Sequence, residues 1–318
     1  MRRLRGAARW GLRLAVSLGI VTYILTQVDR EHLWQSLTGV RLSWIVVALL
    51  LYLVGQGLSA VKWAVLGRSV GLRGSYAEYG RFYFIGMFFN LLGVSTLGGD
   101  VVRALYLARG HRPGLAIDSV LFDRVSGLAV LAALGSVAML AWPRYEVATP
   151  IRIAVVTAGS LLVIGWWLCP RLVELLPVDN RFRRQVEIEL APFWRDRRVL
   201  VRAVALAVVF HVSQACVQWV LGRAAGVALP LTYCLVFHPM VSVLMALPVS
   251  IGGFGVREGA YVYFLALVGV HASTAVTISL LWWAVTVIAG LVGGAIFIAS
   301  GAELPKFHLP RFRRRAAV

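Results

Sequence analysis

The chain has 318 residues, of which 59% are hydrophobic and 14% are charged, and its formal net charge at pH 7 is +18. Soluble globular domains have about a quarter of their residues charged, so this composition excludes an ordinary water-soluble fold. Clustered arginine is also typical of nucleic-acid-binding proteins, but here the arginines lie between long apolar segments. We therefore expect membrane lipids with anionic headgroups, and no nucleic acid, as partners.

The first apolar segment follows a basic N-terminus and extends to Val28. Secretory signal peptides share this charge pattern, but the segment is long, and the residues from Thr22 to Thr26 do not form a small-residue cleavage site. We interpret it as a membrane-spanning helix. Other segments also reach the roughly 20 apolar residues that a bilayer crossing needs. The six predicted spans are residues 8–28, 42–66, 113–141, 151–169, 201–222 and 272–299.

The basic residues predict how these spans are oriented, because cytoplasmic segments of membrane proteins are enriched in Lys and Arg. With the N-terminus inside, 25 of the 32 basic residues, Lys62 among them, belong to cytoplasmic segments and five to external loops. The remaining two, Arg124 and Arg257, fall within membrane segments. We expect a multi-pass protein of a bacterial-type inner membrane, with cytoplasmic N- and C-termini and a basic tail at residues 300–318.

Two apolar segments are interrupted and do not fit as simple spans. Residues 82–109 are broken at 93–99, and residues 231–270 are broken at 248–253. Unpaired backbone is tolerated at membrane depth only where protein or a water-filled cavity satisfies it. Each segment is therefore predicted to form a re-entrant hairpin, the first entering from the cytoplasm and the second from the opposite face.

The interrupted segments belong to an internal repeat. The pattern Gly-Gly-x-x-Val-Arg occurs at residues 98–103 and 252–257, an offset of 154. Upstream of each copy, Val-Leu-Gly-Arg-x-x-Gly occurs at residues 65–71 and 220–226, an offset of 155. Two matches in the same order at nearly the same offset indicate duplication.

These elements predict an all-α polytopic membrane protein with about six full spans and two re-entrant hairpins, arranged as an inverted repeat. It would be a single transmembrane domain, with pseudo-repeats at about residues 8–141 and 151–299. Many secondary transporters have this organisation, with interrupted helices from the two halves meeting near the bilayer midplane. A scaffold in which duplication only provides packing symmetry is the alternative.

The Gly-Gly breaks and the charges beside them are the predicted functional site. A helix that begins after such a break exposes backbone N–H groups and the positive end of its dipole. Arg103 and Arg257 would add positive charge suited to a phosphate group. A cytoplasmic anchor is the alternative for Arg103. Arg257 lies on the wrong side for an anchor and next to Glu258, which favours a buried or cavity-lining role.

Asp123 and Arg124 lie together within the third span. Adjacent residues point about 100° apart on a helix, so Asp123 is expected to pair elsewhere, with Arg103 and Arg257 as candidates. An ion pair that only fixes helix register is the alternative. Asp100 is suited to cap the helix that starts beside it.

Three polar residues of the fifth span, His211, Gln214 and Gln218, share one helix face. They would line a headgroup path or form hydrogen bonds between helices. The sequence contains no Gly-x-Ser-x-Gly, His-Glu-x-x-His or Walker motif, and its three cysteines lack metal-ligand spacing. We therefore expect no enzymatic activity, no metal site and no cofactor.

Four motifs together resemble the lysylphosphatidylglycerol synthase transmembrane-region family, also described as flippase-like. They are Arg81-Phe82 followed by Phe89-Asn90, Gly98-Gly99-Asp100-Val-Val-Arg103, Asp123-Arg124-x-x-Gly127-Leu128, and Pro248-Val-Ser250-Ile-Gly252-Gly253-Phe-Gly255-Val-Arg257-Glu258-Gly259. One departure is the absence of a proline before Gly98, which implies that the first break bends differently from the second.

The resemblance implies a domain that, in bifunctional members, is thought to flip an aminoacylated phospholipid between leaflets. Those members carry a cytosolic aminoacyl-transferase domain after the membrane part. This chain ends at Val318 with a basic tail, so lipid lysylation is not expected. Stand-alone relatives are linked to polyprenyl-glycan or hopanoid lipids, which leaves the substrate open.

The leading hypothesis is a lipid flippase or transporter for an anionic lipid, either a phospholipid or a polyprenyl-phosphate-linked lipid. The alternative is a non-catalytic membrane subunit that anchors a lipid-modifying glycosyltransferase; an intramembrane lipid transferase is a third possibility. The predicted lipid- or anion-binding residues are Gly98, Gly99, Asp100, Arg103, Asp123, Arg124, Ser250, Gly252, Gly253, Arg257 and Glu258. The predicted lining residues are Asn90, His211, Gln214 and Gln218.

Overall fold

The computed structural model describes residues 29–92, 98–108, 113–177, 191–246 and 253–303, and the single positions 19, 20, 22, 26, 180, 183, 186 and 187. This part of the chain is helical and contains no strand. Five helices are long and apolar enough to cross a membrane. They are α3 (Leu42–Ser69), α6 (Pro113–Ala141), α7 (Thr149–Glu174), α10 (Arg197–Ala224) and α13 (Ala272–Ala299).

These five helices match five of the six predicted spans, and the all-α polytopic membrane fold is confirmed. Almost all of the sixth prediction, residues 8–28, lies outside the described residues. The shorter helices are α2 (Arg30–Thr38), α4 (Tyr76–Leu92), α5 (Gly98–Leu107), α9 (Ala191–Arg195), α11 (Leu231–Ala246) and α12 (Val256–Ala266).

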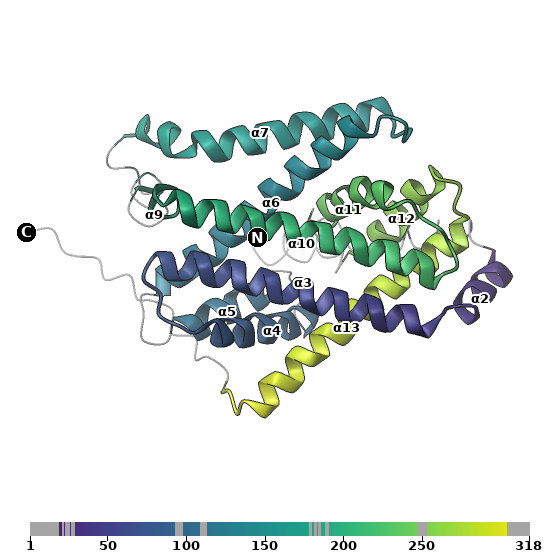
Figure 1. The fold of residues 1–318 in the computed structure, drawn as a ribbon, viewed down its shortest axis with the longest axis horizontal. Coiled ribbons are helices and arrows are strands. Elements are labelled where there is room, and N and C mark those ends of the chain that lie inside the picture. Colours follow the sequence, from purple (N-terminus) through teal and green to yellow (C-terminus); the bar gives the residue numbers. More distant parts are fainter. Residues whose placement is uncertain are drawn as a thin grey trace, which may run out of the picture.

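Helices α3 and α10 form an antiparallel pair through the middle of the bundle (Figure 1). At one end, the Arg41 backbone N–H donates a hydrogen bond to the Ala224 carbonyl over 3.0 Å. At the other end, Leu66 of α3 and Ala203 of α10 belong to one buried apolar cluster. The beginning of each helix therefore lies beside the end of the other.

Helices α4 and α5 form a closely packed antiparallel hairpin. Near its open end, the rings of Phe82 and Tyr106 stack with centroids 5.3 Å apart. Near the turn, a Cβ atom added to Gly99 would lie only 1.8 Å from the Gly86 carbonyl oxygen, so the two backbones are in direct contact. Gly98 and Gly99 were predicted to belong to the break but are the first residues of α5, because a residue without a side chain permits this contact.

Helices α11 and α12 form the second antiparallel hairpin. The Tyr233 hydroxyl donates a hydrogen bond to the Phe264 carbonyl, and the Phe237 ring packs edge-on against Tyr261 at 4.9 Å. Gly253 has φ +80°, a conformation that favours glycine, and packs against the Met245 side chain. The predicted residues Ser250 and Gly252 lie outside the described residues.

The helices recur in the same order in the two halves. Helices α3, α4, α5 and α6 have 28, 17, 10 and 29 residues, and α10, α11, α12 and α13 have 28, 16, 11 and 28. Each hairpin also packs on the long helix of the other half. Phe89 of α4 contacts Phe297 of α13, and Pro239 of α11 contacts Gly135 of α6. The hairpins open toward opposite ends of the bundle (Figure 1).

Helix α7 lies at the edge of the bundle and packs mainly against α6 (Figure 1). Several of its large apolar side chains face outward, for example Leu161 and Trp167, which are more than half exposed. After α7, the short helix α9 places Phe193 against Phe122 of α6, with ring centroids 4.3 Å apart. Asp196 then caps α10 by accepting hydrogen bonds from two backbone N–H groups.

Candidate functional site

Five charged side chains from α3, α5 and α6 form one network, here called the charged cluster. Lys62 Nζ lies 3.0 Å from Asp123 Oδ1, and Arg103 Nη2 lies 3.0 Å from Asp123 Oδ2. Arg103 Nε and Arg124 Nε bind Asp100 at 3.0 and 2.8 Å. Three positive and two negative groups give the cluster a net charge of +1.

Four of these five residues were predicted from the sequence as binding residues. Of the two candidate partners for Asp123, the structure selects Arg103. Asp100 receives the side chains of Arg103 and Arg124 in addition to lying in the first turn of α5. Lys62 was counted among the cytoplasmic basic residues, which was wrong. It is buried in α3, because the Asp123 carboxylate neutralises it there.

Arg103 is the most enclosed cation of the charged cluster, with only 2% of its surface exposed. Its guanidinium lies over the rings of Trp63 and Tyr83, at 4.7 and 5.0 Å from their centroids. Aromatic faces stabilise a cation without neutralising its N–H donors. Arg103 Nη1 is buried and makes no hydrogen bond to any residue that the structure describes. A buried donor of this kind is suited to an anionic acceptor.

Arg124 differs from the other members of the charged cluster because 55% of its side chain is exposed. It is the twelfth residue of α6, so it lies about 16 Å along the helix axis from Pro113. A charged group at such depth in a membrane faces a water-filled cavity or a polar partner rather than hydrocarbon. Arg124 therefore marks an opening from the charged cluster to the surroundings of the bundle.

A cavity of about 350 Å³ adjoins the charged cluster. Lys62, Arg103, Asp123 and Arg124 line it together with several apolar side chains. The Tyr83 hydroxyl at its wall is within hydrogen-bonding distance of Ser59 Oγ, at 3.0 Å. The other lining residues are Val125, Gly127, Leu128, Leu131, Phe210, His211 and Ser242. The mixed lining suits a ligand that has both an anionic group and an apolar part.

Two histidines connect the cavity to the second half of the chain. His211 Nε2 lies 3.1 Å from the Gly127 carbonyl oxygen, which only accepts, so this nitrogen carries the hydrogen. In the neutral ring, His211 Nδ1 then accepts from His238 Nε2 at 3.4 Å, and His238 Nδ1 accepts from the Ser242 hydroxyl at 3.4 Å. His238 had no predicted role, since nothing in its local sequence indicates this pairing.

Arg257 and Glu258 form a separate ion pair at the start of α12. Arg257 Nη2 and Nε bind Glu258 Oε1, the latter at 3.0 Å, and Arg257 Nε also donates to Ser279 Oγ at 3.1 Å. Glu258 Oε2 accepts from the Gly255 backbone N–H at 2.7 Å and so caps the helix. Because this pair is electrically neutral and internally satisfied, it has little excess charge for an anion.

The structure therefore brings Arg103, but not Arg257, to the cavity. Both arginines follow a Gly-Gly pair in sequence. However, Arg103 is the sixth residue of α5 and Arg257 is the second residue of α12. One helical residue turns a side chain by about 100°, so residues matched by motif need not occupy matched positions in space.

Three of the predicted lining residues connect helices instead. Gln218 of α10 and Tyr261 of α12 exchange hydrogen bonds of 2.7 and 2.9 Å. Asn90 Oδ1 accepts from the Gly99 backbone N–H at 2.8 Å and ties the two helices of the first hairpin. Gln214 is buried beside Gly55 at the contact of α10 with α3. Of the four predicted lining residues, His211 lines the cavity.

Tyr261→Phe is expected to lower the free energy of unfolding by about 1–3 kcal/mol, because the buried Gln218 amide loses its partner. Thermal or denaturant unfolding of the purified protein measures this change. Tyr263→Phe is the matched control. The Tyr263 side chain is exposed, so loss of its hydroxyl group should leave the free energy of unfolding unchanged. Equal effects of the two substitutions would contradict the assigned role of the Gln218–Tyr261 pair.

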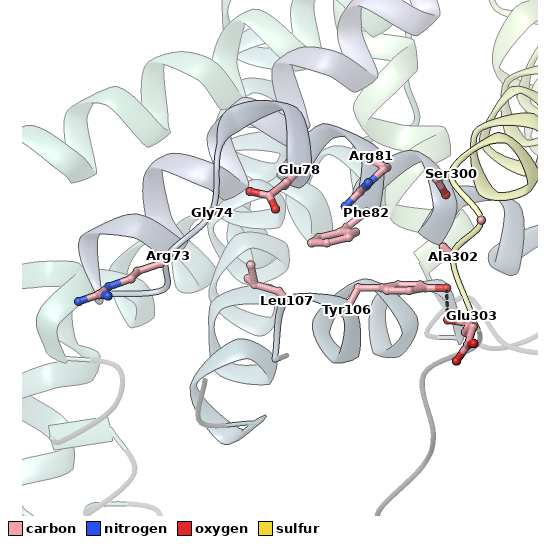
Figure 2. A pocket seen from close by; sticks show the side chains of 11 residues that line it. Arg73, Gly74, Glu78, Arg81, Phe82, Tyr106, Leu107, Ser300, Ala302 and Glu303 are labelled. Atoms are coloured by element: carbon pink, nitrogen blue, oxygen red, sulfur yellow. Dashed lines mark hydrogen bonds between the residues drawn. The ribbon is translucent and has the colours of Figure 1, made fainter. Parts of the chain in front are cut away.

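A larger pocket, of about 500 Å³, lies at the end of the bundle where α4 begins and α5 and α13 end (Figure 2). Arg73, Arg81, Glu78 and Glu303 line it, so its charges balance. The Tyr106 hydroxyl donates a hydrogen bond to the Glu303 carbonyl at 3.0 Å and fixes the segment after α13 (Figure 2). With its balanced charges, this pocket is less suited to an anion than the cavity at the charged cluster.

The fold and the site together define a polytopic α-helical membrane protein with a buried charged cluster beside an internal cavity. The model of the family described as the lysylphosphatidylglycerol synthase TM region matches residues 10–294, and the chain belongs to this family. The matched region contains both hairpins and the charged cluster. A comparison with curated proteins finds no match to the chain.

Proposed function

We propose that this protein is a flippase or transporter that moves an anionic, phosphate-bearing lipid between the leaflets of a membrane. The observation that carries the proposal is the charged cluster. It has excess positive charge, the buried donor Arg103 Nη1 with no partner among the described residues, and an exposed arginine at membrane depth. A phosphate oxygen is the strongest common acceptor for such guanidinium groups.

In this proposal the headgroup reaches the cavity sideways, past Arg124, while the hydrocarbon chains stay outside the cavity. Arg103 and Arg124 hold the phosphate, and Asp100 and Asp123 orient the two guanidinium groups through the ion pairs described above. Lys62 neutralises Asp123, so that both carboxylates stay paired when the site is empty. The headgroup thus exchanges water for charge-assisted hydrogen bonds.

The two halves support an alternating-access mechanism. The antiparallel packing of α3 on α10 and the opposite opening of the two hairpins are the features expected of an inverted repeat. We propose that the protein lies in a bacterial-type inner membrane with cytoplasmic termini. The end of the bundle that contains Glu303 and the pocket of Figure 2 would then face the cytoplasm.

A second candidate function is a non-catalytic subunit that anchors a lipid-modifying glycosyltransferase. The observation that favours it is the open pocket of Figure 2, whose mixed charges suit a protein partner at the proposed cytoplasmic face. Co-purification with such an enzyme, together with full function of Arg103→Gln and Arg257→Ala variants, would favour this role over transport. Neither candidate assigns enzymatic activity to the chain.

Arg124→Gln is expected to slow transbilayer lipid movement by about 10- to 100-fold, because a hydrogen bond to a charged group contributes about 1.5–3 kcal/mol. The measurement is a scramble assay on liposomes that contain the purified protein and lipid extracts with a fluorescent anionic phospholipid. Arg223→Gln is the matched control, because Arg223 lies at the far end of α10 and outside the cavity. If the folded wild-type protein moves no native lipid, the proposed function is wrong.

A further inference from the structure

Beside the cavity lies an apolar groove of about 260 Å³ between α6, α7 and α9. We propose, resting on the function proposed above, that it binds one hydrocarbon chain of the lipid whose phosphate lies at the charged cluster. The cavity and the groove then form a single amphipathic site. The ligand class is accordingly a lipid with a phosphate headgroup and at least one long chain.

The groove begins where the cavity opens. Val125 lines both the cavity and the groove, and its neighbour Arg124 is the exposed member of the charged cluster. Leu121, one turn earlier on α6, also lines the groove and is half exposed. A lipid whose headgroup binds Arg124 therefore has its chain at the mouth of the groove.

The groove has the chemistry of a chain-binding site. No charged residue lines it in the described part of the chain, and its wall is aromatic. The ring of Phe122 contacts Trp166 and Trp194, with centroids 4.5 and 4.9 Å apart, and these two rings lie 5.0 Å from each other. Packed rings of this kind form a rigid apolar surface.

The size and the apolar lining of the groove suit a hydrocarbon chain. A helix with its side chains has a diameter of about 10 Å, so it could cover the groove and place side chains in it but could not enter it as a whole. A single hydrocarbon chain is much thinner and needs no hydrogen-bond partners. The groove therefore favours a lipid chain over an α-helix of another subunit.

Gly165 of α7 keeps the groove open. A Cβ atom added to it meets no atom within 4 Å, although the residue lies within a membrane-spanning helix. A phenylalanine there would project into the groove that Gly165 lines, and its Cβ atom would meet no described protein atom. Replacing glycine within a helix also improves helix propensity, so the substitution should not unfold the protein.

Gly165→Phe provides the test. Gly57→Phe is the matched control, because Gly57 is also a glycine within a membrane-spanning helix, and a Cβ atom added to it meets no atom within 4 Å. The probe is phosphatidic acid with a photoreactive group on one acyl chain. It is mixed with phosphatidylcholine in liposomes that contain the purified full-length protein. Mass spectrometry then measures how much of the label reaches α6 and α7. Unlabelled dihexanoyl phosphatidic acid, whose chains are too short to fill the groove, measures headgroup binding separately.

We expect Gly165→Phe to reduce labelling of α6 and α7 by about tenfold or more, since each excluded methylene group loses apolar burial. Gly57→Phe should leave labelling unchanged. Binding of dihexanoyl phosphatidic acid should persist in Gly165→Phe and fall in Arg124→Gln. Unchanged labelling in Gly165→Phe would overturn the chain site. Equally strong labelling by a photoreactive diacylglycerol would also overturn it, because the groove would then bind bulk lipid.

If Arg124→Gln binds dihexanoyl phosphatidic acid as tightly as the wild type, the proposed function fails instead.

Discussion

Asp123→Ala is expected to lower the free energy of unfolding by about 3–5 kcal/mol, which is the usual cost of removing one partner of a buried ion pair. The Asp123 carboxylate lies 3.0 Å from both Lys62 Nζ and Arg103 Nη2, and all three side chains are buried. Its removal leaves the three cations of the charged cluster with Asp100 as the one carboxylate of the cluster. The measurement is denaturant unfolding of the purified protein in detergent micelles.

The matched control is Glu187→Ala, which removes a carboxylate that pairs with Arg183 at 2.7 Å near the surface. An exposed pair of this kind contributes roughly 0.5 kcal/mol, because water screens it. The double variant Lys62→Met with Asp123→Leu should regain much of the stability lost in Asp123→Ala, since it removes charge of both signs from the bundle interior. A loss below about 1 kcal/mol in Asp123→Ala would show that the charged cluster contributes little to folding.

The spans were predictable because the bilayer dictates their length and polarity. Five predicted spans coincide with α3, α6, α7, α10 and α13 to within a few residues. The differences lie at the ends, where polar residues continue a helix beyond the apolar segment. Helix α7, for example, continues through Pro170 to Glu174, whereas its prediction ended at residue 169. Apolar composition predicts which residues lie in the hydrocarbon core of the bilayer, whereas capping and loop packing determine where each helix ends.

The site was predictable in its components and less so in its geometry. An aspartate and an arginine within a span require partners, so Asp123 and Arg124 could be identified from sequence alone. The role of Lys62 could not, because it depends on a contact between residues 61 positions apart. Close to the end of an apolar span, a lysine has the pattern of an anchor. Only the packing of α3 on α6 shows that it is buried.

Gly99→Ala is expected to disrupt the first hairpin and, with it, the position of Arg103. The added methyl group would lie 1.8 Å from the Gly86 carbonyl oxygen and 2.7 Å from the Asn90 side chain. The Gly86 backbone cannot move aside without shifting α4 away from α5. Overpacking of this kind costs about 1–3 kcal/mol, and more where backbone must move. Because Arg103 follows one turn later on α5, the shift also lengthens its contact with Asp123.

The expected result is therefore a double loss, of stability in denaturant unfolding and of lipid movement in the liposome assay. Gly57→Ala is the matched control, since the added methyl group at this position of α3 meets no atom and should leave both quantities unchanged. The small size of residue 99, rather than flexibility at a break, is then what the Gly-Gly motif provides in the first half. A stable, active Gly99→Ala variant would instead show that α4 and α5 separate at no cost and that their close contact does not position Arg103.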